Sequence, residues 1–297
     1  MKKHPRACED VFSCAFTYSQ CMKRYIIIEK HVGETPLSAM EAWRAREGMS
    51  CDIPLAYAGR LDPMASGQLL VLIGEECKRQ EHYHAFDKEY VFEILFGFAS
   101  DTGDVLGMAD AAGKTDAEHA SKAPTAPELR RALRTFLGTH PFPYPRFSAK
   151  TVRGIPLHEW TLRGDLPDSE VPTYTANIKS IRLNNLREES GADILKNMLA
   201  RIDLIPPVID PRKALGADFR RGDIIPRWHS LLDNPETMYS IATVTATVGS
   251  GTYIRSLAPA IAEALGTYGL AYSIHRTKIG TYLPLPLGTG IWLKTFR

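Results

Sequence analysis

A two-residue alternation of apolar side chains constrains the fold of this chain most strongly. Residues 90–98 place an apolar side chain at every second position: Tyr90, Phe92, Ile94, Phe96 and Phe98. Residues 241–248 repeat the pattern with Ala242, Val244, Ala246 and Val248. A period of two places such residues on one face of a strand, because successive side chains point to opposite sides. Both stretches are therefore predicted to be half-buried strands of a sheet.

Apolar runs and capping residues indicate the other elements. Thr35 followed by Pro36 predicts the start of a helix, because threonine caps and proline fits the first turn. Leu37, Met40 and Trp43 predict its apolar stripe, and Gly48 its end. Further strands are predicted at 25–28, 69–73 and 178–183, and further helices at 127–137, 194–202 and about 252–265.

Strands and helices interleave without a regular βαβ period. We therefore predict the α+β class, with a mixed or antiparallel sheet. Three prolines in residues 140–147 argue against regular structure there. Residues 188–236 have a blurred pattern outside the helix predicted at 194–202. The chain contains neither a phosphate-binding P-loop nor a dinucleotide fingerprint, so no nucleotide cofactor is predicted.

The composition is that of an ordinary globular protein. Of 297 residues, 44% are hydrophobic and 24% are charged. No apolar run approaches the roughly 20 residues that span a bilayer. The first 22 residues lack the apolar core of a secretory signal. We expect a soluble, cytoplasmic protein with one domain at 22–297, preceded by an extension at 1–21 of unknown role.

The five cysteines do not indicate a disulfide framework, because their number is odd and no C-x-x-C pair occurs. Cys8, Cys14 and Cys21 lie near His4, but their spacing fits no common zinc pattern. Reduced thiols are the favoured interpretation and a metal site is the less favoured one. We predict no metal site.

Positive charge is concentrated in residues 130–163, although the formal net charge is only +2. This stretch contains one acidic residue, Glu159, and seven basic residues: Arg130, Arg131, Arg134, Arg146, Lys150, Arg153 and Arg163. Phe142, Tyr144 and Phe147 lie among them. Such a mixture suits the phosphates and unstacked bases of an RNA loop. On charge alone, an arginine-rich helix surface explains the stretch equally well.

Asp62 stands out as a candidate for chemistry. It lies in a glycine-flanked loop directly before the buried strand at 69–73, and Pro63 restricts its backbone. An aspartate held in this way can project from a rigid scaffold into a cleft. A plain Asp-Pro turn is the alternative on these residues alone.

Several motifs, in the same order along the chain, resemble the TruB family of tRNA pseudouridine synthases. Residues 59–67 (G-R-L-D-P-M-A-S-G) are similar to the family's G-x-L-D-P-x-A-[ST]-G. The others are G-E-T-P-L at 33–37, D-K-E-Y at 87–90, S-D-T-G-D at 100–104, F-S-A-K at 147–150 and G-T-Y-I-R-S at 251–256. Any one motif would be a weak signal, whereas the collinear set is very specific.

The resemblance implies the fold and activity of that family. The implied fold is the pseudouridine synthase catalytic fold, with a central mixed, mainly antiparallel sheet flanked by helices and loops. The implied reaction converts uridine to pseudouridine at the T-loop uridine 55 of tRNA, without cofactor or metal. The implied partner is RNA, the tRNA T-arm above all, and we expect a monomer. A synthase for another RNA and a non-catalytic RNA-binding or tRNA-folding homologue are the alternatives.

The resemblance also assigns roles to individual residues. Asp62 matches the catalytic aspartate, and Arg255 matches the arginine that pairs with it. Tyr90 matches a tyrosine that stacks on the target base, Ile274 an apolar residue near that base, and Tyr57 stands where many members have a histidine. The residues expected to contact the RNA backbone are Arg131, Arg134, Arg146, Lys150 and Arg153.

Some features depart from the family pattern. Glu34 replaces a lysine, and residues 188–236 form a predicted insertion without an assigned function. We also predict that the chain lacks the C-terminal PUA RNA-binding module common in the family. A carboxylate-based hydrolase would need a second acid near Asp62, and the sequence indicates none. Asp101 and Asp104 are interpreted as parts of a turn.

Overall fold

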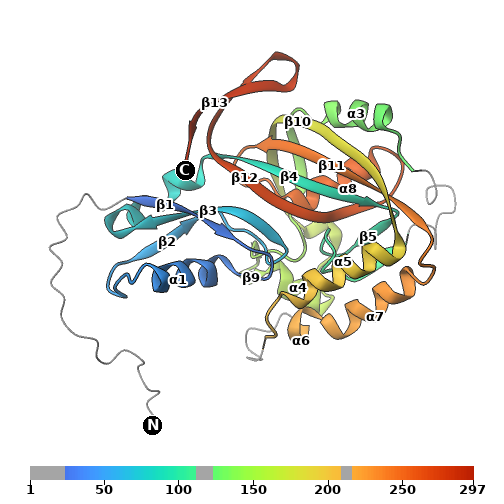
Figure 1. Cartoon of the computed structure of the whole chain (residues 1–297), viewed down its shortest axis with the longest axis horizontal. Coiled ribbons are helices and arrows are strands. Elements are labelled where there is room, and N and C mark those ends of the chain that lie inside the picture. The colour runs from blue at the N-terminus through green and yellow to red at the C-terminus, as the bar shows by residue number, and fades with distance from the viewer. Residues whose placement is uncertain (1–23, 112–122, 209–215) are drawn as a thin grey trace, which may run out of the picture.

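A mixed nine-stranded sheet forms the centre of the molecule in the computed structural model, which describes residues 24–111, 123–208 and 216–297 (Figure 1). Its main order is β1-β3-β12-β4-β11-β10-β7, with β13 beside β12 and β2 beside β3. Only β3 and β12 pair in parallel, and every other pair in this sheet is antiparallel. The bounds are β1 Tyr25–Lys30, β2 Leu55–Ala58, β3 Ala65–Ile73, β4 Asp87–Phe96, β7 Gly138–Pro143, β10 Thr173–Ser190, β11 Met238–Val248, β12 Gly269–Leu285 and β13 Thr289–Thr295. The predicted α+β class with a mixed, mainly antiparallel sheet is confirmed.

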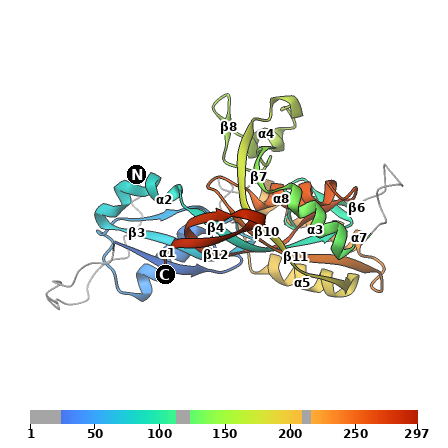
Figure 2. The same cartoon turned by 90° about the horizontal axis from the view of Figure 1, so that it is seen from above.

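Helices cover both faces of this sheet. Their bounds are α1 Pro36–Arg46, α2 Gln80–His84, α3 Ala126–Thr135, α4 Leu157–Arg163, α5 Gly191–Asp203, α6 Gly216–Phe219, α7 Arg221–Leu231 and α8 Ile254–Glu263. Two short hairpins pair β5 Phe98–Ser100 with β6 Ala109–Ala111 and β8 Thr151–Val152 with β9 Ile155–Pro156. Figure 2 shows α3 and α8 on one side of the sheet and α5 on the other. Apolar clusters accordingly fill both sides.

The alternating strands are confirmed, with one exception. Tyr90, Phe92, Ile94 and Phe96 share the core on the α8 side with the alternating residues of β11. Phe98 does not, because Gly97 adopts a left-handed backbone (φ +93°) and ends β4. The chain turns there, so Phe98 packs with Trp228 in the core on the other side of the sheet.

Helix α1 begins where the sequence predicts. The Thr35 side chain accepts a hydrogen bond from the Ser38 backbone, Pro36 fills the first turn, and Gly48 takes a left-handed conformation after the helix. Met40 and Trp43 are buried, but Leu37 is 56% exposed, so its predicted place in the apolar stripe is wrong. The buried face follows the helical spacing of Ala39, Met40 and Trp43 instead.

Of residues 140–147, predicted to be irregular, the first half is a strand and the second half is irregular as predicted. Residues 138–143 form β7 although they contain Pro141 and Pro143. Strand β7 lies at the edge of the sheet, where a residue without a backbone N–H is tolerated. Tyr57 and Ala58 end strand β2, directly before the loop that carries Asp62.

Residues 188–236 form the end of β10 and helices α5, α6 and α7, apart from 209–215, which lie outside the described residues. The helix predicted at 194–202 is confirmed as α5, which buries Ile194, Met198 and Ile202. The predicted extension at 1–21, with three of the cysteines, also lies outside the described residues. Among those that are described, no helix has both the length and the apolar character needed to cross a membrane.

Candidate active site

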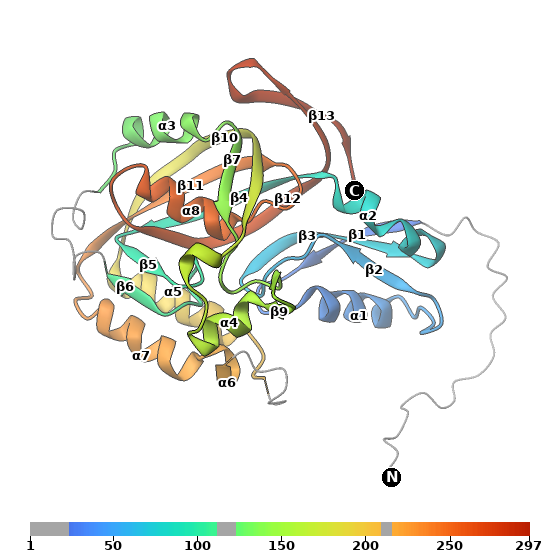
Figure 3. The ribbon, with the colours of Figure 1, turned by 180° about the vertical axis from the view of Figure 1, so that it is seen from behind.

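A cavity of about 630 Å³ opens where the loop between β2 and β3 meets the first turn of α8. Asp62, Tyr90, Arg255 and Ile274 all line it, although they are far apart in the sequence. Figure 3 shows α4 on this side of the sheet, between α1 and α7. The volume lies within the roughly 300–1,000 Å³ of small-ligand pockets. Four of the five residues assigned to catalysis or substrate binding therefore meet in one cavity.

Asp62 projects into this cavity from a tight loop. Gly59 has φ +82°, a conformation that favours glycine, and the Ala65 backbone N–H donates to the Asp62 carbonyl at 3.0 Å. Leu61 and Met64 are buried on either side of the turn and anchor it. The Asp62 side chain is 44% exposed, so a ligand in the cavity can reach its carboxylate.

Arg255, in the first turn of α8, fixes the orientation of this carboxylate. Its Nε donates to Asp62 Oδ2 at 2.7 Å, its Nη1 to the Thr102 carbonyl at 2.8 Å and its Nη2 to the Phe147 carbonyl at 3.2 Å. The side chain is only 7% exposed. A charge-assisted hydrogen bond from a donor held at three points leaves Asp62 little freedom.

A second carboxylate, that of Asp104, lies behind the same guanidinium. Its Oδ2 is 3.8 Å from Arg255 Nε, and its Oδ1 accepts hydrogen bonds from the Thr102 hydroxyl (2.6 Å) and the Leu106 backbone (3.0 Å). Burial raises the pKa of Asp104. Burial alone would lower the pKa of Arg255, but the charges of Asp62 and Asp104 raise it above its ordinary value.

Asp104 is thus a site residue that the sequence analysis treated only as part of a turn. Asp104 does lie in a turn, but its carboxylate faces Arg255. The S-D-T-G-D motif was the signal that could have identified Asp104 as a site residue. Asp104 is buried and hydrogen-bonded whereas Asp62 is accessible. The two acids share one cation, and only Asp62 presents a largely exposed carboxylate to the cavity, unlike the flanking acids of many hydrolases.

Tyr90 and Ile274 form part of the apolar wall of the cavity. Tyr90 lies on β4 and Ile274 on the neighbouring β12, where Ile274 faces Phe92 across the strand pair. Both are largely buried and belong to the same apolar cluster as Leu61. The wall is therefore part of the main core, which makes it rigid.

Two buried cations, Lys30 and Arg276, hold the loop that carries Asp62, and a third, Lys88, holds the neighbouring turn before β4; none of the three was predicted from the sequence. Lys30 Nζ donates to the Ala65 carbonyl at 2.6 Å, and Arg276 donates to the carbonyls of Gly59 (3.1 Å) and Gln68 (2.7 Å). Lys88 Nζ donates to two carbonyls in the turn before β4. Burial lowers the pKa of Lys30 and of Lys88 to about 8.

The structure does not bring Tyr57 to the cavity. Its side chain packs with Trp43 and the other apolar residues between α1 and the β1–β3 strands. Because β2 is a strand, successive side chains alternate between its faces, and Tyr57 points to the α1 side. Its predicted role in substrate binding is not supported by this position.

The predicted RNA-backbone residues beside the cavity are partly neutralised. Arg146 forms an ion pair with Asp168, and Arg153 with Glu170. Lys150 lies over the ring of Tyr144, 5.1 Å from its centroid. These acids follow soon after the stretch 130–163, so the positive count of that stretch overstates the local charge.

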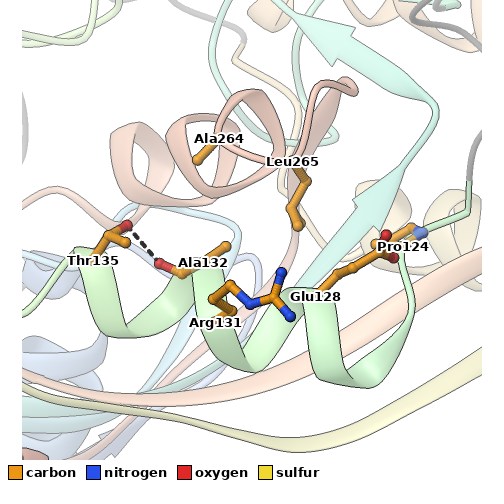
Figure 4. A pocket seen from close by; sticks show the side chains of 7 residues that line it. All are labelled: Pro124, Glu128, Arg131, Ala132, Thr135, Ala264 and Leu265. Atoms are coloured by element: carbon orange, nitrogen blue, oxygen red, sulfur yellow. Dashed lines mark hydrogen bonds between the residues drawn. The ribbon is translucent and has the colours of Figure 1, made fainter.

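Arg131 and Arg134 lie elsewhere, on α3. Arg131 lines a separate cavity of about 320 Å³ between α3 and the residues that follow α8, together with Glu128 and Leu265 (Figure 4). Arg255 lies in the first turn of α8, whereas this cavity adjoins the residues after its last turn, and the ten-residue helix between them is about 15 Å long. The five predicted backbone contacts thus form two groups instead of one patch.

Cations that the sequence analysis did not select line the cavity itself: Arg60, Lys88, Arg220 and Arg276. These cations come from segments far apart in the sequence, since Arg220 belongs to residues 188–236 and Arg276 to β12. No cluster of three His, Cys, Asp or Glu side chains in the described residues could hold a metal ion.

Comparisons with known proteins agree on one family. The family model described as "TruB family pseudouridylate synthase (N terminal domain)" matches residues 54–203, half of the chain. The "tRNA pseudouridine synthase B" of Caldicellulosiruptor saccharolyticus is 25% identical over 261 residues, covering 88% of this chain and 69% of that protein. The protein of the same name from Syntrophus aciditrophicus is 27% identical over 165 residues, 54% of this chain and 50% of its own length.

A solved structure is also similar over most of the chain. A Cbf5-Nop10-Gar1 complex contains a chain that is 17% identical, with a TM-score of 0.48, covering 86% of this chain and 48% of that one. The chain described here thus spans between about half and about two thirds of the length of these similar proteins.

Proposed function

Because this chain belongs to the TruB family of pseudouridylate synthases, we propose that it converts uridine to pseudouridine in RNA, at the T-loop uridine 55 of tRNA. The observation that carries the proposal is an accessible carboxylate, Asp62, held by a buried guanidinium, Arg255, at the wall of a cavity that can admit a nucleoside. The names of the similar proteins support the same reaction.

The reaction rearranges atoms without any net gain or loss. The bond between N1 of uracil and C1′ of ribose breaks, the base turns, and C5 bonds to C1′. The C5 proton leaves and N1 acquires a proton, so neither an oxidant nor a reductant is needed. The protein must therefore supply a carboxylate, a fixed geometry and a dry cavity.

Asp62 is the group proposed to act at the sugar, either as the nucleophile at C1′ or as a base at the ribose. Arg255 keeps its carboxylate aimed into the cavity, since three separate acceptors fix the guanidinium.

Tyr90 and Ile274 are proposed to receive the target base. A base within folded RNA reaches Asp62 only after it leaves its stack, and apolar or aromatic side chains then replace its stacking partners. Both residues lie on the cavity wall and both are held by the core. They can therefore meet the base without first becoming ordered.

Charge around the cavity suits an RNA backbone. Of the five cationic side chains in the lining, Lys88, Arg255 and Arg276 are buried and Arg220 is paired with Asp101, so the exposed Arg60 is the one placed to meet a phosphate. Phosphate contacts of this kind position RNA without reading its sequence. We also propose that the chain acts as a cytoplasmic monomer on the T-arm.

The test is turnover by the purified chain on a tRNA transcript, with pseudouridine mapped along the RNA. We expect one pseudouridine per transcript at position 55, and none in a matched transcript with cytidine there. Mapping in total RNA from cells with and without the gene shows whether another RNA is the substrate. Tight tRNA binding without any turnover would instead favour a non-catalytic RNA-binding role.

A further inference from the structure

Residues 188–236 reach the cavity with Phe219, which ends α6, and with Arg220. Arg220 lies between α6 and α7, where Asp218, Phe219 and Arg220 all have a left-handed backbone, with φ of +55°, +57° and +59°. Residues other than glycine rarely adopt this conformation, and it persists only where the surrounding structure enforces it. Three in succession indicate that specific contacts hold this corner.

Arg220 makes two such contacts. Its Nη1 and Nη2 donate to the two carboxylate oxygens of Asp101, at 2.5 and 3.1 Å. The flat guanidinium also lies over the ring of Phe147, 4.4 Å from the ring centroid. Only 18% of the side chain is exposed. Arginine is suited to this double role because its planar group can pair at its edge and stack on its face.

Both partners of Arg220 adjoin the groups that hold Arg255. Asp101 directly precedes Thr102, whose carbonyl accepts from Arg255 Nη1. The carbonyl of Phe147 accepts from Arg255 Nη2. The contacts close a ring from Arg255 to the 101–102 segment, to Arg220, to Phe147 and back to Arg255. Arg220 thus joins the two chain segments whose carbonyls hold the guanidinium of Arg255.

We propose that Arg220 is a positioning residue for the Asp62–Arg255 pair, an inference that rests on the proposed function. Without it, the segments that carry Thr102 and Phe147 can separate, and Arg255 loses a fixed acceptor. Asp62 is then aimed less accurately at the sugar, and the rate of the chemical step falls. Affinity for RNA changes little, because Asp101 already neutralises Arg220 and most of the side chain is covered.

The fold should survive the loss of Arg220, since other residues also hold α7 against the same loop. Trp228, which is fully buried, donates from Nε1 to the Val105 carbonyl at 3.1 Å. Arg227 donates from Nε to the Ala109 carbonyl at 2.8 Å and forms an ion pair with Asp110. Arg227 therefore offers a matched control, because it lies on the helix that Arg220 directly precedes, contacts the same segment (residues 101–110) and lies outside the ring.

The experiment compares the wild type with Arg220→Ala, Arg220→Lys and Arg227→Ala. The single-turnover rate of pseudouridine formation, the Kd for tRNA and the Tm are measured for each. We expect Arg220→Ala to lower the rate about 10- to 100-fold with a Kd within about threefold of wild type. Arg220→Lys, which keeps the ion pair but not the planar stack, should be intermediate, and Arg227→Ala close to wild type.

Crystal structures of the wild type and Arg220→Ala give a readout apart from turnover. We expect the hydrogen bond from Arg255 Nη2 to the Phe147 carbonyl, 3.2 Å here, to lengthen or break in the variant. An unchanged Arg255 geometry would overturn the inference, whether or not the wild type modifies RNA. So would a raised Kd and weaker salt dependence at an unchanged rate, which would make Arg220 a phosphate contact. A wild type inactive on every RNA would defeat the proposed function alone.

Discussion

Two arginines near opposite ends of helix α8, Arg255 and Arg131, have opposite surroundings. At the first turn, Arg255 is buried and its donors meet Asp62 and two carbonyls, with Asp104 nearby. Past the last turn, Arg131 of α3 is exposed beside Glu128 at a shallow cavity (Figure 4). The buried charge is tied to one geometry, because an unpaired charge in the core is costly. The exposed Arg131 is not tied to one geometry, and we expect it to act on RNA through its charge.

Asp62→Asn tests the buried end most severely. Asparagine keeps the size of the side chain and can still accept from Arg255, but it can neither attack C1′ nor take up a proton. We expect the single-turnover rate to fall at least about 10³-fold while tRNA binding stays nearly intact. Asp110→Asn, which alters a carboxylate that pairs with Arg227 and does not line the cavity, is the control. A fall much smaller than about 10³-fold in the Asp62 variant would refute the assignment of Asp62.

Arg255→Lys separates the charge at this end from its geometry. Lysine remains cationic but lacks the planar fork that reaches Asp62, Thr102 and Phe147 together. We expect a rate about 10²-fold lower at saturating RNA, and a lower free energy of unfolding because buried carbonyls lose donors. A rate close to wild type would mean that a nearby positive charge suffices.

Arg131→Ala combined with Arg134→Ala tests the exposed end. If RNA follows α8 along its length, tRNA binding weakens by a few-fold and its salt dependence flattens by about one unit of slope per lost phosphate contact. The rate at saturating RNA should not change. Lys196→Ala, an exposed lysine on the opposite side of the sheet, serves as the control. An unchanged slope would place the RNA track elsewhere.

Lys88→Met has the smallest expected effect on the reaction but a definite effect on stability. Burial lowers the pKa of Lys88 from 10.5, the ordinary value of a lysine, to about 8. Between these two pH values the lysine keeps its proton in the unfolded chain but has lost it in the folded chain. The group therefore makes the free energy of unfolding rise with pH across this window, by up to about 1.4 kcal/mol per pH unit. Urea unfolding from pH 7 to 10 should show a shallower rise in the variant. Lys196→Met, which alters an exposed lysine, should leave the slope unchanged.

Local pattern was enough to predict much of the fold. The alternation in β4 and β11, the Thr35 cap of α1 and the buried strand before Ile73 all depend on neighbours a few residues apart. The motifs also identified Asp62 and Arg255 as a pair, although 193 positions separate them, because the resemblance supplied a contact that no local rule contains.

Other features depended on how distant segments pack. Phe98 changed sides because a single left-handed glycine ended its strand. Tyr57 turned away from the cavity because the register of β2 decided its face. Arg146 lost its free charge to Asp168, just outside the basic stretch. In each case the surroundings of the residue depend on segments that the local sequence pattern does not include.

The sequence by itself determined which stretches form strands and helices, and which carboxylate and guanidinium belong to the site. Only the tertiary structure decided that Asp104 stands behind Arg255 and that Arg220 reaches Asp101 across 119 positions. The physical reason is range. Periodicity and capping act over one or two turns of chain, whereas a buried charge is satisfied by whichever groups the packed sheet and helices bring within hydrogen-bonding distance.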